Sequence, residues 1–338
     1  MAATIKDVAK SANVGIATVS KYLNGGNVLE KNRVLIDKAI IELNYRINSL
    51  ARSLKTNKTM TIGVLIPSLE NIFSTSIVSG IENILQEAGY STLICDFQEN
   101  TALEQKKLIF LGERQIDGLL YMPLKGCPEG LKYLQDHDIP VVLIDRAIKN
   151  GECDTVLIDN LNASYEAVEH LIVMGHRRIG IINGPTHIFT AEERMRGYYR
   201  VHEDYAISVD QDLIVCGDYR MDTAYEQAMK MLTSERAPTA LFVTNYEMTL
   251  GALMAINDLN LKVPEDCSFI GFDNIALANI IKPPLTIVVQ PTSEIVEMAA
   301  QLLLKRMKGN FESFPELIRM KTKLIKKNTV GQLKSPVM

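Results

Sequence analysis

The chain has 338 residues, 47% of them hydrophobic and 22% charged, which is typical of a globular protein with two or three domains. No apolar run approaches the length of a membrane span, and Lys6 places a charge where a signal peptide would be apolar. These features exclude an integral membrane protein and argue against export, so we expect a cytoplasmic protein.

The charge is unevenly distributed along the chain. Residues 1–60 hold ten Lys/Arg and four Asp/Glu, whereas residues 61–338 hold 26 Lys/Arg and 36 Asp/Glu. A basic segment joined to an acidic body is typical of a polyanion-binding module attached to a second domain.

The basic segment predicts three short helices. Thr4 and Asp7 have the spacing of a capping box ahead of a first helix that ends near Ser11. A second helix is predicted over 16–24, and a third over 30–43 follows Gly25-Gly26. The predicted inward face of the third helix is Val34, Ile36, Ala39, Ile40 and Leu43.

Two short helices joined by a tight turn form a helix-turn-helix unit, although the pattern alone fits a generic helical hairpin equally well. In a DNA-binding unit the start of the second helix enters the major groove. The candidates there are Ile16, Ala17 and Lys21 toward base edges, and Thr18, Ser20 and Asn24 toward phosphates. Thr4 is a further candidate for a DNA contact.

Four segments together, 3–10, 18–21, 23–25 and 42–45, resemble the headpiece of the lactose/purine repressor (LacI/GalR) family of bacterial transcription regulators. The sequence departs from the family pattern at a few positions. Lys21 stands where Arg is usual, and Ile47 stands where Pro is usual. Gly15 and Leu29 stand where Ser usually caps a helix, and leucine is a poor cap.

The resemblance implies a headpiece over 1–46 and a hinge helix with its linker over 47–60. Eight residues are too few for a stable isolated helix, so the hinge is expected to form only with a partner and DNA. Hinge helices of the family enter the minor groove, where Leu54 would wedge a base step; alternatively, Leu54 packs onto the body. The hinge contacts expected are Asn48, Ala51, Arg52, Leu54 and Lys55.

Beyond residue 60, apolar strands alternate with helices, which predicts parallel sheets. The predicted strands are 61–67, 91–95, 117–122, 140–144, 178–183, 212–216, 239–243, 267–272, 287–291 and 320–325. The predicted helices are 77–88, 101–115, 165–174, 192–202, 223–232, 247–259 and 293–307. The cycle restarts after residue 160, so we expect two α/β halves with a cleft between them.

By the same resemblance, residues 61–338 form an α/β periplasmic-binding-protein-like core of two Rossmann-like subdomains. The first subdomain would take about 61–160 and 291–320, and the second about 161–290 and 321–330. The whole chain would then combine an α-helical helix-turn-helix headpiece with this ligand-binding and dimerisation core.

Polar residues that follow strands are candidates for a small-molecule effector site in the cleft. Asp145, Arg146, Asn245 and Asp273 follow the carboxyl ends of predicted strands, and Arg194 begins a predicted turn over 194–198. The resemblance implies that Arg194, Asn245 and Asp273 hold the effector. It adds Phe73 as an aromatic wall, Gln290 near a crossover, and Tyr246, which stands where the family has Asp.

The sequence is compatible with either an anionic or a neutral effector. With Tyr246 in place of a carboxylate, Arg146 and Arg194 have fewer acidic neighbours, which suits a sugar acid or a sugar phosphate. Alternatively, Arg146 pairs with Asp145 or Asp159 and the ligand is a neutral sugar.

No dinucleotide, Walker or Gly-x-Ser-x-Gly motif is present, and the five cysteines form no Cys-x-x-Cys pair, so we expect no enzyme activity, cofactor or metal. The resemblance implies a homodimer, joined through helix 77–88 and residues 279–281, that binds palindromic operator DNA. It implies a repressor of carbohydrate-utilisation genes that the effector releases or tightens.

Overall fold

The computed structural model describes residues 3–23, 25–45, 58–124, 126, 128–148, 152–273 and 275–333, without the side chains of 275–277. Its contacts divide the chain into two compact units, Met1–Thr59 and Met60–Met338. No helix among the described residues is long and apolar enough to cross a bilayer.

The first unit contains helices α1 (Ile5–Ser11), α2 (Ile16–Leu23) and α3 (Glu30–Glu42). The predicted capping box is confirmed, because the Thr4 side chain accepts from the Asp7 amide while Asp7 accepts from the Thr4 amide at 2.8 Å. The core of this unit is Val8, Ala9, Ala12, Val19, Ile36 and Ala39. The inward placement of Val34 was wrong. Val34 is 59% exposed, since two residues of helix turn it about 200° away from Ile36.

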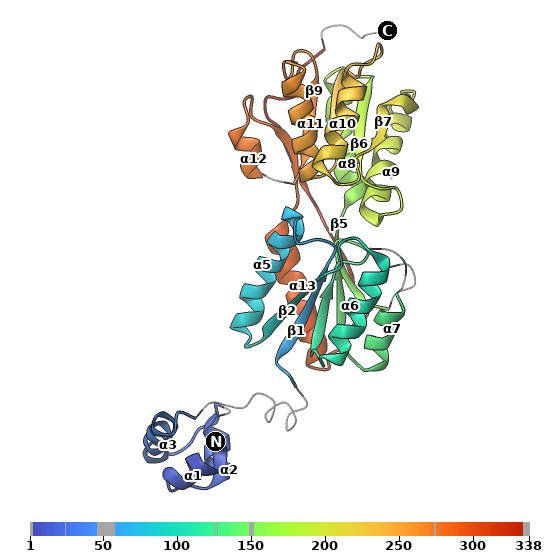
Figure 1. Cartoon of the computed structure of the whole chain (residues 1–338). Coiled ribbons are helices and arrows are strands. Elements are labelled where there is room, and N and C mark those ends of the chain that lie inside the picture. The colour runs from blue at the N-terminus through green and yellow to red at the C-terminus, as the bar shows by residue number, and fades with distance from the viewer. Residues whose placement is uncertain are drawn as a thin grey trace. The chain divides into compact units, whose positions relative to one another are not determined.

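The second unit contains two six-stranded sheets (Figure 1). Each sheet and the helices packed on it form one lobe, and we call the two the N-terminal lobe (the sheet with β1) and the C-terminal lobe (the sheet with β6). The sheet of the N-terminal lobe is entirely parallel, with the order β11-β5-β4-β3-β1-β2. Its strands are β1 (Thr61–Ile66), β2 (Ser91–Asp96), β3 (Gly118–Tyr121), β4 (Val141–Ile144), β5 (Asp154–Ile158) and β11 (Leu317–Met320). Its helices are α5 (Ile72–Glu87) and α13 (Thr292–Met307) on one face, and α6 (Thr101–Glu113) and α7 (Glu129–Asp136) on the other.

The sheet of the C-terminal lobe has the order β12-β10-β9-β8-β6-β7, with only β12 antiparallel. Its strands are β6 (Ile179–Asn183), β7 (Ile214–Cys216), β8 (Ala240–Val243), β9 (Ser268–Phe272), β10 (Thr286–Val289) and β12 (Lys323–Ile325). Its helices are α8 (Asn160–Val173), α9 (Phe189–Asp204), η1 (Gln211–Leu213), α10 (Met221–Leu232), α11 (Tyr246–Asp258) and α12 (Ile275–Ile280).

The chain passes between the lobes where β5 leads to α8, where β10 leads to α13, and where β11 leads to β12. The single strand predicted over 320–325 was therefore wrong, because its two ends belong to different sheets. Strand β5 and helix α7 were not predicted.

Two helices begin earlier than predicted because a side chain caps each of them. Helix α5 begins at Ile72, and Asn71 accepts from the Ser74 amide at 2.9 Å. Helix α8 begins at Asn160, and Asp159 accepts from the Asn162 amide at 3.2 Å.

Candidate functional site

The second helix of the first unit presents the predicted DNA-contact residues on its surface. Ile16 is 47% exposed, Ala17 and Lys21 are exposed, and Thr18 and Ser20 are partly exposed. A hollow of about 600 Å³ beside them is lined by Ala17, Thr18, Lys21, Asn27, Val28, Leu29 and Asn32. The last four come from the segment leading into α3 and from its first turn, where no motif marked them as DNA-contact candidates.

Thr4 has a structural role in this unit. Its hydroxyl oxygen accepts from the Asp7 amide at 3.4 Å and its hydroxyl donates to an Asp7 carboxylate oxygen at 2.7 Å, so the side chain serves as a helix cap. The other predicted DNA contacts, Asn24, Asn48, Ala51, Arg52, Leu54 and Lys55, lie outside the described residues.

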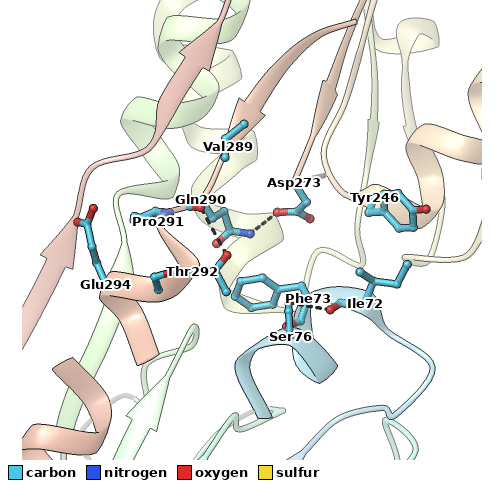
Figure 2. Close-up of a pocket in the computed structure, with 11 residues that line it drawn as sticks. Ile72, Phe73, Ser76, Tyr246, Asp273, Val289, Gln290, Pro291, Thr292 and Glu294 are labelled. Atoms are coloured by element: carbon cyan, nitrogen blue, oxygen red, sulfur yellow. Dashed lines mark hydrogen bonds between the residues drawn. The ribbon is translucent and has the colours of Figure 1, made fainter. Parts of the chain in front are cut away.

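The structure brings the predicted effector residues together between the two lobes. An inner chamber of about 40 Å³ is lined by seven of the eight: Phe73, Asp145, Arg146, Arg194, Asn245, Asp273 and Gln290. An outer chamber of about 420 Å³ is lined by the eighth, Tyr246 (Figure 2). Phe73, Asp273 and Gln290 line both chambers and form the wall between them.

Arg194 is held rigidly by α9 and its neighbours. Its Nε donates to Asn160 Oδ1 at 2.8 Å, and one terminal nitrogen donates to the Thr244 carbonyl. The guanidinium lies 4.0 Å from the centre of the Phe272 ring, which adds a cation–π contact. Because the side chain is 97% buried, these partners fix its charge in the wall of the inner chamber.

Arg146 is paired with Asp145. Its Nε lies 3.5 Å from Asp145 Oδ2, an ion-pair distance at which Nε makes no hydrogen bond, and both side chains are almost fully buried. Another guanidinium nitrogen donates to the Pro123 carbonyl at 3.3 Å. Burial raises the pKa of Asp145, and the charges of Arg146 and then Arg194 oppose that rise. The pairing matches one of the two alternatives left open by the sequence.

Asp273 and Gln290 contribute a polar pair to the wall between the chambers. Gln290 Nε2 donates to Asp273 Oδ1, and Figure 2 shows this bond. Burial raises the pKa of Asp273, opposed first by the Arg194 charge and then by the Gln290 hydrogen bond. Among the described residues, Gln290 Oε1 is one of four buried side-chain atoms without a partner. It is therefore an acceptor able to take a ligand hydroxyl.

Asn245 is the N-cap of α11, and both of its polar atoms have partners. Its Oδ1 accepts from the Met248 amide at 3.0 Å, and its Nδ2 donates to Glu247 Oε2 at 2.7 Å. Glu247 Oε1 in turn accepts from the Ile72 amide of the opposite lobe at 3.2 Å. Burial raises the pKa of Glu247, and the charges of Asp273 and Glu99 add to that rise. Glu247 was not predicted.

Tyr219 also lines the inner chamber and was not predicted. Its hydroxyl lies 2.9 Å from Thr190 Oγ1. The ring packs so closely over Gly184 that a Cβ at that position would lie 2.1 Å from Tyr219 Cζ, so only glycine fits there. The available signal was a Gly-Asp-Tyr turn directly after β7, because the carboxyl ends of parallel strands line such clefts.

Comparison with known proteins identifies the family. Residues 4–48 match the model described as bacterial regulatory proteins, lacI family, and residues 168–330 match a periplasmic binding protein-like domain. The HTH-type transcriptional repressor PurR of Vibrio atlanticus is 34% identical over 328 residues, which cover 95% of this chain and 98% of the relative. The chain belongs to the lacI family of bacterial regulatory proteins.

Two solved structures show the same architecture. A Lac repressor dimer bound to operator and the anti-inducer ONPF has a TM-score of 0.88 at 24% identity, covering 98% of this chain and all of that one. The regulator CelR in complex with cellobiose has a TM-score of 0.73 at 28% identity, covering 97% of this chain and 99% of that one.

These similarities confirm the predicted fold class and family. The chain combines a helical helix-turn-helix headpiece with a two-subdomain α/β periplasmic-binding-protein-like core. It is a transcriptional repressor of the lacI family rather than an enzyme.

Proposed function

We propose that this repressor acts in the cytoplasm, where it binds palindromic operator DNA as a homodimer and controls carbohydrate-utilisation genes. Its headpiece spans 1–46, its hinge and linker 47–60, and its ligand-binding and dimerisation core 61–338. The effector is a neutral, hydroxyl-rich ring compound, a sugar, that enters the cleft between the lobes.

The contacts of Arg194 and Arg146 are the main support for a neutral effector. Arg194 is bonded to Asn160 and a carbonyl, and Arg146 is paired with Asp145. Asp273 and Glu247 lie at the same cleft and add further acidic groups. A carboxylate or phosphate would face the carboxylates of Asp145, Asp273 and Glu247 beside the two arginines, so the geometry disfavours a sugar acid or sugar phosphate.

The remaining groups suit hydroxyls and a ring. Asp273 and Gln290 offer acceptor oxygens, and Asn245 offers amide hydrogens, as a polyhydroxylated ligand requires. Phe73 and Tyr219 provide apolar ring faces in the same chamber. The CelR structure, which contains cellobiose, supports a sugar on a related core.

A ligand panel tests the effector class. We expect cellobiose or glucose to raise the melting temperature of the full-length protein, since a ligand at one hundred times its Kd stabilises by about 2.7 kcal/mol. Gluconate and glucose 6-phosphate test the anionic alternative, and guanine tests a planar base stacked on the two aromatic rings. Stabilisation only by an anionic compound or by guanine would overturn the neutral-sugar proposal.

Selection of duplexes from a random library with the full-length protein tests the DNA part. We expect palindromic sequences whose affinity falls with salt by a slope of about −0.9 per phosphate contact. Enrichment of non-palindromic sequences, or a flat salt dependence, would contradict operator binding by a dimer through a basic headpiece.

A further inference from the structure

One chain of hydrogen bonds leads from the inner chamber across the cleft. Asn245 lines the chamber in the C-terminal lobe, Glu247 lies in the first turn of α11, and Ile72 is the first residue of α5 in the N-terminal lobe. Glu247 binds the other two, one through each carboxylate oxygen. It therefore links an effector-lining side chain of the C-terminal lobe to the N-terminal end of α5, whose residues Phe73 and Ser74 also line the chamber.

The orientation of the Asn245 amide is fixed by its second bond. Because Oδ1 caps α11 by accepting from the Met248 amide, Nδ2 must face Glu247. An inverted amide would lose the cap and place its oxygen against a carboxylate. Nδ2 carries two hydrogens and directs one of them at Glu247, so a ligand oxygen placed on the Glu247 side of Asn245 competes with Glu247 for that hydrogen.

The other end of the link holds an amide that α5 itself leaves open. The first N–H groups of a helix have no partner within the helix. Asn71 caps the Ser74 amide, whereas the Ile72 amide donates to Glu247. Helix α5 packs on α13, and its residues 77–87 lie in the segment 77–88 that was expected, by resemblance, to form part of the dimer interface. A change at Ile72 thus occurs at the start of the helix that carries this segment.

We propose that Glu247 is the positioning residue that transmits the state of the effector chamber to helix α5. This inference rests on the proposed function. A ligand oxygen that takes the Asn245 Nδ2 hydrogen now directed at Glu247 removes the donor that orients the Glu247 carboxylate. Glu247, which also lies near Asp273 and Glu99, then loosens its hold on the Ile72 amide. Binding of a ligand in the chamber therefore weakens the hydrogen bond that holds the first turn of α5.

Reversing the direction of the Asn245–Glu247 bond tests this link without any ligand. In N245D two carboxylates face each other, and in E247Q two amide donors do. In the double variant N245D/E247Q, the new glutamine donates to the new aspartate. The aspartate still caps Met248, and the glutamine oxygen still accepts from Ile72. The measurement is amide hydrogen exchange of the full-length protein, with peptides spanning residues 69–76.

We expect exchange at the start of α5 to accelerate about tenfold in each single variant and to return to within about threefold of wild type in the double variant. E192Q, which alters an exposed carboxylate in the first turn of α9, should leave it unchanged. Unchanged exchange in N245D, or a double variant whose acceleration is the product of the two singles, would overturn the link. Neither result depends on the ligand panel, so failure of the sugar proposal is recognised separately.

Discussion

Replacing Arg306 with methionine should destabilise the core strongly, because this side chain is the centre of a buried ionic cluster. Arg306 is 99% buried at its side chain, and it binds Asp154 through two nitrogens at 2.7 and 3.0 Å. It also donates to Glu316 at 2.9 Å and to the carbonyls of Asn310 and Glu312 at 2.8 and 3.0 Å. These bonds join α13 to β5 and to the segment that leads into β11.

The size of the stability loss depends on the buried charge of Asp154, which R306M leaves without its ion-pair partner. Asp154 is fully buried, and without Arg306 its described hydrogen-bond donor is the Glu316 amide at 2.7 Å. Removing one partner of a buried ion pair costs about 3–5 kcal/mol, mainly because the other charge stays buried without compensation. At roughly 2–4 °C per kcal/mol for a unit of this size, the melting temperature should fall by about 6–20 °C.

Urea unfolding followed by circular dichroism measures this loss. Arg319→Met is the matched control, since that arginine is 39% exposed in its ion pair with Glu193 and should cost less than about 1 kcal/mol. The double variant D154L/R306M removes both charges and should recover part of the stability. An R306M loss no larger than that of Arg319→Met, or a double variant less stable than R306M, would refute the reasoning.

Three further predictions concern other parts of the chain. Leu29→Ser should stabilise the headpiece by about 1 kcal/mol, measured by thermal unfolding, because Leu29 is the N-cap of α3 and makes no side-chain cap bond. Tyr219→Ala should weaken effector binding about tenfold or more in calorimetry, whereas Tyr219→Phe, which keeps the ring, should change it little. Burial lowers the pKa of His176 below 6.5, so the unfolded state binds more protons and stability falls as the pH drops below that value. Unfolding free energies between about pH 7 and pH 5 should decline less in His176→Asn than in wild type.

The sequence was most informative where function depends on local patterns. The Thr4–Asp7 capping box involves only neighbouring residues, so spacing alone predicted it correctly. The boundary between β11 and β12 was missed, because only two residues separate the strands and the strands differ in which distant sheet they join. Tyr219 was missed for a similar reason. Its position depends on the space over Gly184, which no local pattern encodes.

The charge of the site also depended on contacts that spacing could not specify. Arg146 and Asp145 are adjacent in sequence, but only the folded structure shows that both side chains are buried as an ion pair. Likewise, Asn245 was recognised as polar at a strand end, whereas its bond to Glu247 and the onward bond to Ile72 required both lobes to be in place.

The two chambers together constrain how an effector acts. A volume of about 40 Å³ holds only a few waters, far below the roughly 300 Å³ of a typical ligand pocket, so a sugar cannot enter the inner chamber of this conformation. The outer chamber, about 420 Å³, already admits a ring at the wall formed by Phe73, Asp273 and Gln290. An effector therefore reaches Asn245 only after the walls of the inner chamber have moved apart, and it shifts the conformational equilibrium by its preference for that wider state. A shift from one to ninety-nine per cent requires about 5.5 kcal/mol of differential affinity. Several hydrogen bonds of about 1 kcal/mol each, together with aromatic contact, supply a free energy of that order only if they form in the open state alone. The Glu247–Ile72 bond, which joins the two lobes in this structure, contributes part of the free energy that the effector must overcome.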